Sequence, residues 1–95
     1  MTTESVRVVN QLGMHARAAA KFVHVATRFD SRVRVARDAR EIDGKSIMGI
    51  LLLAAARGST ITISAEGADE RDAVDALVAL VASGFGEDDG EGVKR

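Results

Sequence analysis

Apolar residues in this chain follow two alternating spacings, and this switching limits the possible folds more than any other feature. Three segments carry apolar residues at every second position, which is typical of strands with one buried face. Three others carry them at i, i+3, i+4 and i+7, which is typical of amphipathic helices. The strand segments contain Val6 and Val8; Val33 and Val35; and Ile61, Ile63 and Ala65. The helical segments span 19–26, 47–54 and 73–81.

A fourth, shorter strand completes the predicted order of elements. Residues 41–43 are expected to pair with 33–35 through a turn at 38–40. The order βαββαβα predicts an α+β fold, a two-layer sandwich with three helices on one face of a mostly antiparallel four-stranded sheet. With 95 residues, the chain should form one domain over 1–85. Residues 86–95 are acidic and glycine-rich and are expected to be a flexible tail.

Local signals predict where the helices begin and end. Ser46 is a suitable N-cap for the second helix, which should end near 57–59. Asp69, followed three residues later by Asp72, resembles a capping box that opens the third helix. Gly84 is placed to end that helix in the left-handed conformation.

Composition narrows the classes of function. The chain has 13 Lys and Arg against 14 Asp and Glu, a net charge of −1, so no general attraction to nucleic acid or acidic lipid is expected. Cysteine is absent, which excludes disulfides and thiolate metal sites. The N-terminus lacks the pattern of a secretion signal, and the longest apolar run, 47–56, is too short to span a membrane. We expect a cytoplasmic monomer that does not insert into membranes.

The stretch "NQLGMHARAAAKFV" places His15 where a loop becomes a helix. The first turn of a helix offers unpaired backbone N–H groups and favours negative charge. A phosphoryl group on the His15 ring would lie against the amides of Ala16 and Arg17, and the Arg17 guanidinium could add paired donors. Imidazole can accept and release such a group at neutral pH. The alternative, that His15 only caps the helix and Arg17 is a solvated charge, stays open on spacing alone.

For the other candidate sites, a structural interpretation is favoured over a binding or catalytic one. His24 lies about two and a half turns from His15, on roughly the opposite face of the helix, so the two cannot share a metal; no metal or cofactor is expected. "DGKS" at 43–46 lacks the earlier glycine of a phosphate-binding loop and reads as a turn with a helix cap. Ser46 is nevertheless a plausible regulatory phosphorylation site. The arginines at 32–40 have no aromatic neighbours for stacking on RNA, so a solvated face of the sheet is favoured over an RNA-binding surface.

The second helix carries more apolar residues than one buried stripe requires. One set of apolar residues is expected to face the core. A second set then lies on a neighbouring face of the helix, and its exposure predicts a docking surface for a protein partner. A more enclosed packing of the helix remains the alternative. The inward set is Ile47, Ile50, Leu51 and Ala54, and the neighbouring set is Met48, Leu52 and Ala55.

Two separated motifs, "NQLGMHARAAAKFV" and "DGKSIMGILLLAAARGSTITISAEGADE", are similar to the histidine-containing phosphocarrier protein (HPr) family of the bacterial phosphoenolpyruvate-dependent phosphotransferase system. The resemblance runs from about residue 6 to residue 85. It implies an open-faced sandwich with sheet order 1-4-2-3. It also implies that His15 is phosphorylated on Nδ1, that Arg17 contacts the phosphate, and that Ser46 is modified by HPr kinase/phosphorylase.

The same resemblance implies partners. Enzyme I would be the phosphoryl donor and a IIA-type protein of sugar transport or regulation the acceptor, with no small-molecule turnover by the carrier itself. The docking residues we expect are Met14, Ala20, Ile47, Met48 and Leu52. The competing hypothesis is a regulatory docking protein controlled at Ser46, with little relay through His15.

The chain departs from the common family pattern at one position. Ala18 replaces a proline found in many sugar-pathway members. Proline in the first helical turn fixes the backbone at little cost, so alanine should loosen the helix start slightly without removing a phosphate ligand. Alanine here resembles the nitrogen-related branch, often called NPr. The pathway is therefore open, while the carrier chemistry is expected.

Overall fold

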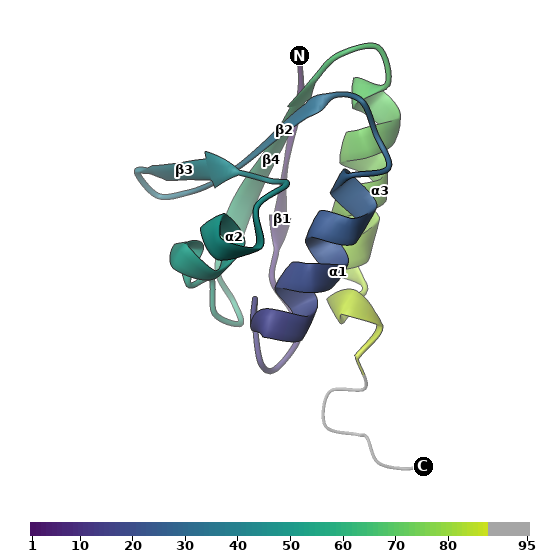
Figure 1. The fold of residues 1–95 in the computed structure, drawn as a ribbon. Helices are drawn as coiled ribbons and strands as arrows, with labels where there is room; N and C mark the ends of the chain where they lie inside the picture. The colour runs from purple at the N-terminus through teal and green to yellow at the C-terminus, as the bar shows by residue number, and fades with distance from the viewer. Residues whose placement is uncertain (88–95) are drawn as a thin grey trace.

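The computed structural model describes residues 1–87, and its elements follow the predicted order (Figure 1). The four strands form one antiparallel sheet in the order β1-β4-β2-β3, which confirms the predicted fold and topology. The elements are β1 (Thr2–Arg7), α1 (Ala16–Ala26), β2 (Arg32–Arg37), β3 (Arg40–Asp43), α2 (Ile47–Leu53), β4 (Thr60–Glu66), α3 (Glu70–Ala82) and a short 3₁₀ turn, η1 (Gly84–Gly86).

The sheet has one buried and one solvated face. In the register, Val33 of β2 lies opposite Ala65 of β4 and Val35 opposite Ile63, and all four side chains are buried. The alternating residues of β2 are exposed arginines, as the spacing predicted. On the solvated face, hydroxyl groups of β1 and β4 pair across the strands at 3.1 Å. The alternation therefore places β2 and β4 correctly with respect to the core.

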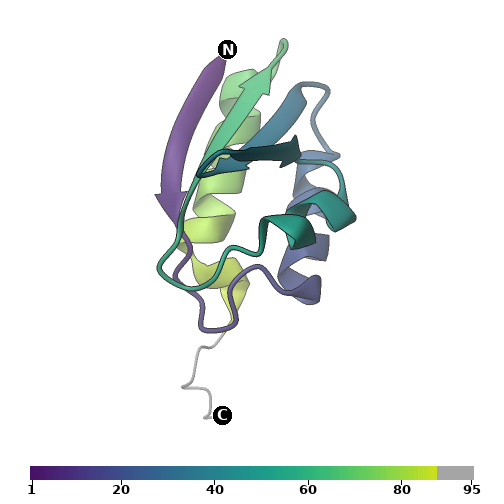
Figure 2. The same ribbon diagram turned by 90° about the vertical axis from the view of Figure 1, so that its left-hand side faces the viewer.

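Helices α1 and α3 lie side by side behind the sheet (Figure 2). α1 buries Phe22 together with small alanines, and α3 buries Val74, Leu77 and Val81. Small side chains on α1 let its backbone approach its neighbours closely, and aliphatic side chains fill the remaining space. Along α3 the spacing predicts a buried stripe of Ala73, Ala76, Leu77, Leu80 and Val81. The stripe is shifted in the structure, since Val74 is buried while Ala76 and Leu80 are only half-buried.

Helix α2 differs from the expectation in its length and its buried face. It ends at Leu53, because Ala54 adopts a left-handed conformation with φ 52°. The Arg37 and Arg40 guanidinium groups donate to the carbonyls of Leu53 and Leu52, at 2.7 and 2.5 Å, and so satisfy the end of the helix. The predicted end at 57–59 was therefore wrong.

The buried side chains of α2 are Ile50 and Leu53. Ile47, Leu51 and Ala54, which we expected to face inward, are exposed. Ala55 was assigned to the neighbouring exposed face but is buried beyond the helix end. A helix of seven residues has fewer than two turns, so packing beside α1 and β3 decides its buried face, rather than a repeating stripe.

The start of α3 is held by tertiary contacts instead of a capping box. Asp69 makes no side-chain cap bond; its carboxylate accepts from the backbone N–H groups of Asp30 (2.9 Å) and Ser31 (3.0 Å) and from the Ser31 hydroxyl. These bonds, the hydroxyl bond foremost, hold the pKa of Asp69 below its ordinary value. The predicted capping box was therefore wrong, and Asp69 fastens the α1–β2 turn to α3.

The end of the described chain is packed against the domain. Gly84 has φ +73°, the left-handed end predicted for α3, and Phe85 is buried directly after it. Of the expected flexible tail, only Gly86 and Glu87 fall within the described residues, and 88–95 lie outside them. Across the part of the chain that the structure describes, no helix has the length and apolar character needed to cross a membrane.

Candidate functional site

The loop before α1 is fixed by a close backbone approach at Gly13. This residue has φ +66°, and a Cβ atom there would lie 2.7 Å from the carbonyl oxygen of Ala55. The next residue, Met14, donates its backbone N–H to that same carbonyl at 3.0 Å. The loop is therefore fastened to the segment that follows α2. This contact sets the position of His15 relative to α2.

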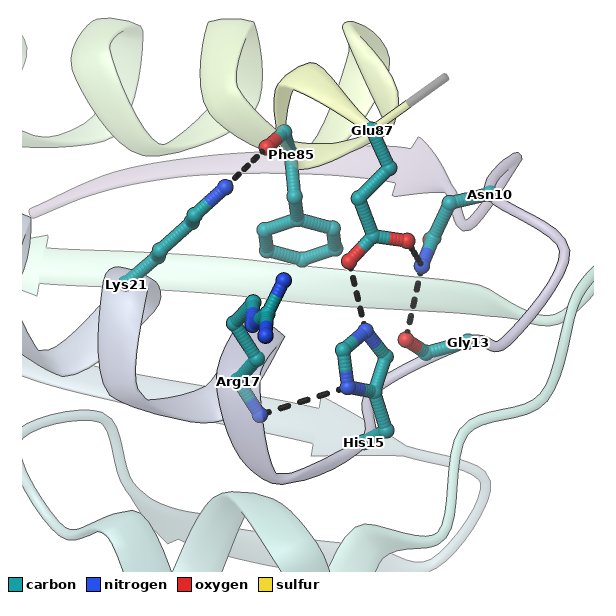
Figure 3. Close-up of polar contacts among 7 residues, drawn as sticks. All are labelled: Asn10, Gly13, His15, Arg17, Lys21, Phe85 and Glu87. Carbon is teal, nitrogen blue, oxygen red and sulfur yellow. Dashed lines mark hydrogen bonds and ion pairs between the residues drawn. The ribbon is translucent and has the colours of Figure 1, made fainter. Parts of the chain in front are cut away.

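His15 is the N-cap of α1, and its ring is held at both nitrogens (Figure 3). Nδ1 accepts a hydrogen bond from the backbone N–H of Arg17 at 3.2 Å. Nε2 lies 2.5 Å from Oε2 of Glu87. The His15 side chain is 26% exposed, so its ring is partly covered but reachable from solvent. The structure thus places an accessible imidazole at a helix start, where the sequence predicted it.

The start of α1 is suited to bind an anion. No acidic residue lies in its first turn, and within residues 1–87 the Ala16 N–H has no hydrogen-bond acceptor. The exposed Arg17 guanidinium also makes no hydrogen bond or ion pair with the described residues. A helix N-terminus favours a nearby negative charge by roughly 0.3–1 kcal/mol at an exposed site. The Ala16 N–H and the Arg17 guanidinium are therefore available as donors to an anion.

A second group at this site was missed by sequence reasoning. Glu87 contacts both His15 and Asn10, whose side-chain amide donates to Oε1 of Glu87 at 3.0 Å. The amide of Asn10 also donates to the Gly13 carbonyl at 2.8 Å, and its side chain is fully buried. Glu87 follows a glycine-rich stretch with no periodicity, so no local signal pointed to this contact.

Ser46 occupies the cap position predicted for it. Its hydroxyl oxygen accepts from the backbone N–H of Gly49 at 3.0 Å, and its side chain is half-buried. In the preceding turn, the backbone N–H of Lys45 donates to Asp43 and the Lys45 ammonium donates to the Phe29 carbonyl. Lys45 therefore serves the turn, in agreement with the plainer reading of "DGKS".

The outer side of α2 presents a group of exposed apolar residues, here named the α2 face: Ile47, Met48, Leu51 and Leu52. Met48 is 66% exposed, and Ala20 on α1 is exposed as well. Met14, which the sequence placed among the docking residues, is only 5% exposed. Met14 therefore belongs to the hydrophobic core and offers this surface little area.

His24 and the acidic residues are the other possible metal ligands within residues 1–87. His24 is exposed in the last turn of α1, away from the helix start that His15 caps. Within the described range 1–87, no group of three or more His, Asp or Glu side chains is arranged to hold a metal ion.

Comparison with known proteins gives one consistent result. A family model described as the phosphorylation site of the PTS HPr component matches residues 2–83. Phosphocarrier protein HPr of Cupriavidus necator is 48% identical over 87 residues, which cover 92% of this chain and 98% of that protein.

Solved structures agree with the sequence relatives. The chain is similar to HPr from Thermoanaerobacter tengcongensis, with a TM-score of 0.88 and 44% identity over 92% of this chain and 98% of that one. It is also similar to Crh, the Bacillus subtilis catabolite repression HPr, with a TM-score of 0.62 and 40% identity over 84% of this chain and 95% of that one.

Proposed function

The chain belongs to the HPr family of phosphocarrier proteins of the phosphotransferase system, and we propose that His15 accepts a phosphoryl group from phosphorylated enzyme I and passes it to a IIA-type protein. The observation that carries this proposal is the placement of an accessible imidazole as the N-cap of α1, with Nδ1 bonded to the backbone N–H of Arg17 in the first turn. A hydrolase would need to activate water, whereas a carrier needs only a nucleophile that can also leave.

The two hydrogen bonds of the ring identify its reactive nitrogen. Nδ1 accepts a hydrogen bond and so carries a lone pair. In the proposed step this lone pair attacks the phosphorus of the donor, and the donor's bond to phosphorus breaks with its electron pair returning to the donor. In the second half the Nδ1–P bond breaks, its electron pair returns to Nδ1, and the acceptor protein takes the phosphoryl group.

Ala16 and Arg17 would stabilise the charged group on Nδ1. Phosphorylation removes the lone pair that accepts from the Arg17 N–H, so this amide and that of Ala16 become donors to phosphoryl oxygens. The Arg17 guanidinium can add two parallel hydrogen bonds. Because none of these donors has a competing carboxylate in the first turn, the phosphorylated state would be formed without breaking an existing ion pair of Arg17.

The α2 face would dock both protein partners. It is apolar, exposed, and linked to His15 through the backbone contact between Met14 and Ala55. A partner seated on Met48 and Leu52 would cover apolar area and bring its own active site to the imidazole. Ala20, exposed on α1, would extend the contact on the other side of the site.

We further propose that phosphorylation of Ser46 regulates this docking. The Ser46 hydroxyl caps α2 directly before Ile47 and Met48, so a phosphate there would add negative charge at the border of the α2 face. The likeness to Crh, whose name refers to catabolite repression, favours a second candidate function. In that alternative the protein is a regulatory docking module controlled at Ser46, with little relay through His15.

One experiment separates the two functions. The protein is incubated with enzyme I and phosphoenolpyruvate and analysed by mass spectrometry before and after acid treatment. We expect one acid-labile phosphoryl group on the wild type and on His24→Ala, and none on His15→Ala. Binding of enzyme I should be retained by His15→Ala. A wild-type protein that stays unmodified would contradict the relay and favour the docking module. A His15→Ala protein that is still modified would contradict the assignment of His15 as the acceptor.

A further inference from the structure

The carboxylate of Glu87 contacts His15 across 72 residues of sequence (Figure 3). We propose that Glu87 is a positioning residue for phosphoryl transfer: it holds the imidazole proton on Nε2, so that Nδ1 stays unprotonated and keeps the lone pair that attacks phosphorus. This inference rests on the proposed relay through His15 and adds a residue to it.

The two ring nitrogens have partners of opposite kind, and together these partners define the tautomer. The Arg17 N–H can only donate, so Nδ1 must be the acceptor at 3.2 Å. An ionised carboxylate can only accept, so Nε2 must carry the proton that it shares with Glu87 at 2.5 Å. A free neutral imidazole exchanges between both tautomers. Here the protein selects the one whose Nδ1 can form a bond to phosphorus.

Glu87 is held in place by contacts that do not involve the histidine. Its Oε1 accepts from the buried amide of Asn10 at 3.0 Å, and its side chain is only 16% exposed. Two residues earlier, Phe85 is buried, and its carbonyl accepts from the Lys21 ammonium at 2.8 Å. The turn that carries Glu87 is thus anchored to both the loop before α1 and α1 itself.

The orientation of the Asn10 amide fits a carboxylate as the hydrogen-bond partner of its NH₂ group. Its NH₂ group donates to the Gly13 carbonyl and to Glu87, while its own oxygen, Oδ1, is buried without a hydrogen-bond partner within the described residues. Turning the amide over would place Oδ1 against two acceptor oxygens. The observed orientation therefore leaves one buried acceptor unsatisfied and gives Glu87 a donor from a rigid, buried group.

The charge of Glu87 also suits the transfer itself. When Nδ1 bonds to phosphorus, the ring has substituents on both nitrogens, and a positive charge develops over the imidazole. The Nε2 proton stays in place, and the electron pair of the Nδ1–P bond returns to Nδ1 when the group leaves. A carboxylate on Nε2 lies beside this charge in both directions of transfer, as in other sites where a carboxylate orients a histidine.

The test compares Glu87→Gln and Glu87→Ala with wild type, with Glu66→Gln as a control that removes an exposed carboxylate elsewhere. Imidazole ¹⁵N chemical shifts are measured on the unphosphorylated proteins at alkaline pH, where an ordinary imidazole is neutral. We expect the Nε2–H tautomer for wild type and for Glu66→Gln, and a mixture of tautomers for Glu87→Ala. An unchanged tautomer in Glu87→Ala would overturn the proposal, whatever the transfer rate.

The second measurement is the single-turnover rate of phosphoryl transfer from phosphorylated enzyme I. For histidines that bind a metal, loss of the outer hydrogen-bond partner typically lowers metal affinity or activity roughly 10–100-fold. By analogy, we expect the transfer rate to fall about tenfold for Glu87→Ala, with unchanged affinity for enzyme I. A smaller fall is expected for Glu87→Gln, whose amide oxygen can still accept from Nε2–H. Wild-type rates in both variants would overturn this inference alone, whereas absence of phosphohistidine in the wild type would overturn the proposed function.

Discussion

Replacement of Gly13 by alanine tests how the loop before α1 positions His15. Gly13 has φ +66°, and a Cβ atom at this position would lie 2.7 Å from the Ala55 carbonyl oxygen and 3.0 Å from Cα of Ala56. Both neighbours are backbone atoms, so neither can move aside by changing a rotamer. The variant must strain the left-handed turn and also push the loop away from the segment after α2.

The expected loss of unfolding free energy in Gly13→Ala is the sum of two costs. The left-handed conformation costs a residue with Cβ roughly 1–2 kcal/mol. Forcing an additional carbon into a filled space costs about 1–3 kcal/mol. Gly86→Ala is a matched control, because Gly86 has φ +71° and a Cβ atom there would meet nothing within 4 Å. We expect Gly13→Ala to lower the free energy of unfolding by about 2–5 kcal/mol, and Gly86→Ala by only the first term.

The free energy of unfolding is measured for both variants by urea titration, and phosphoryl acceptance by the folded fraction is measured with enzyme I. Displacement of the loop also moves His15 relative to the α2 face, so acceptance by folded Gly13→Ala should be slower than by the wild type. Equal destabilisation of the two variants would refute the close approach, and wild-type acceptance by folded Gly13→Ala would refute its role in positioning His15.

Three further predictions concern docking, pH and the core. Met48→Asp should raise the KM of enzyme I for this protein about tenfold, equivalent to about 1.4 kcal/mol of binding free energy, because it places a charge in the apolar α2 face. The control Ala79→Asp, at an exposed position of α3, should leave this KM unchanged. Equal KM values for the two variants would remove the α2 face from the proposed interface. Hydrogen bonds from the Thr2 hydroxyl and the Gly67 N–H, together with the Met1 amino group, lower the pKa of Glu70 from 4.5 to about 2. The Glu70 carboxylate therefore stabilises the fold above pH 4.5, and this contribution is lost as the pH falls towards 2. Urea titrations of wild type and Glu70→Gln over this interval should show a weaker pH dependence for the variant, and identical slopes would contradict the assignment. Leu77→Ala, at a fully buried position of α3, should lower the free energy of unfolding by about 2–5 kcal/mol, and a loss below 1 kcal/mol would show that this position is not packed as described.

The parts of the fold that the sequence predicted are those with a repeating pattern and a single buried face. Val33, Val35, Ile61 and Ile63 alternate over strands whose other face is solvated, so a shift of one residue would expose the entire core set. The start of α1 at His15 was also predictable, since a cap and the first apolar positions lie within one turn of each other.

The parts that the sequence did not predict depend on contacts between distant segments. α2 is too short for its spacing to define one buried face. Met14 is buried in the core because the loop before α1 is fastened to the segment after α2. Asp69 bonds to the turn after α1 rather than to its own helix. Glu87 reaches His15 from a stretch without periodicity. In each case tertiary packing overrode the local pattern.

The hydrogen bond between His15 and Glu87 has a consequence for how the protein is made. The two residues are 72 positions apart, so a growing polypeptide on the ribosome contains the imidazole long before it contains the carboxylate. The ring acquires its second partner only when synthesis of the domain is nearly complete. A product of early termination would carry His15 without the carboxylate that holds the imidazole proton on Nε2.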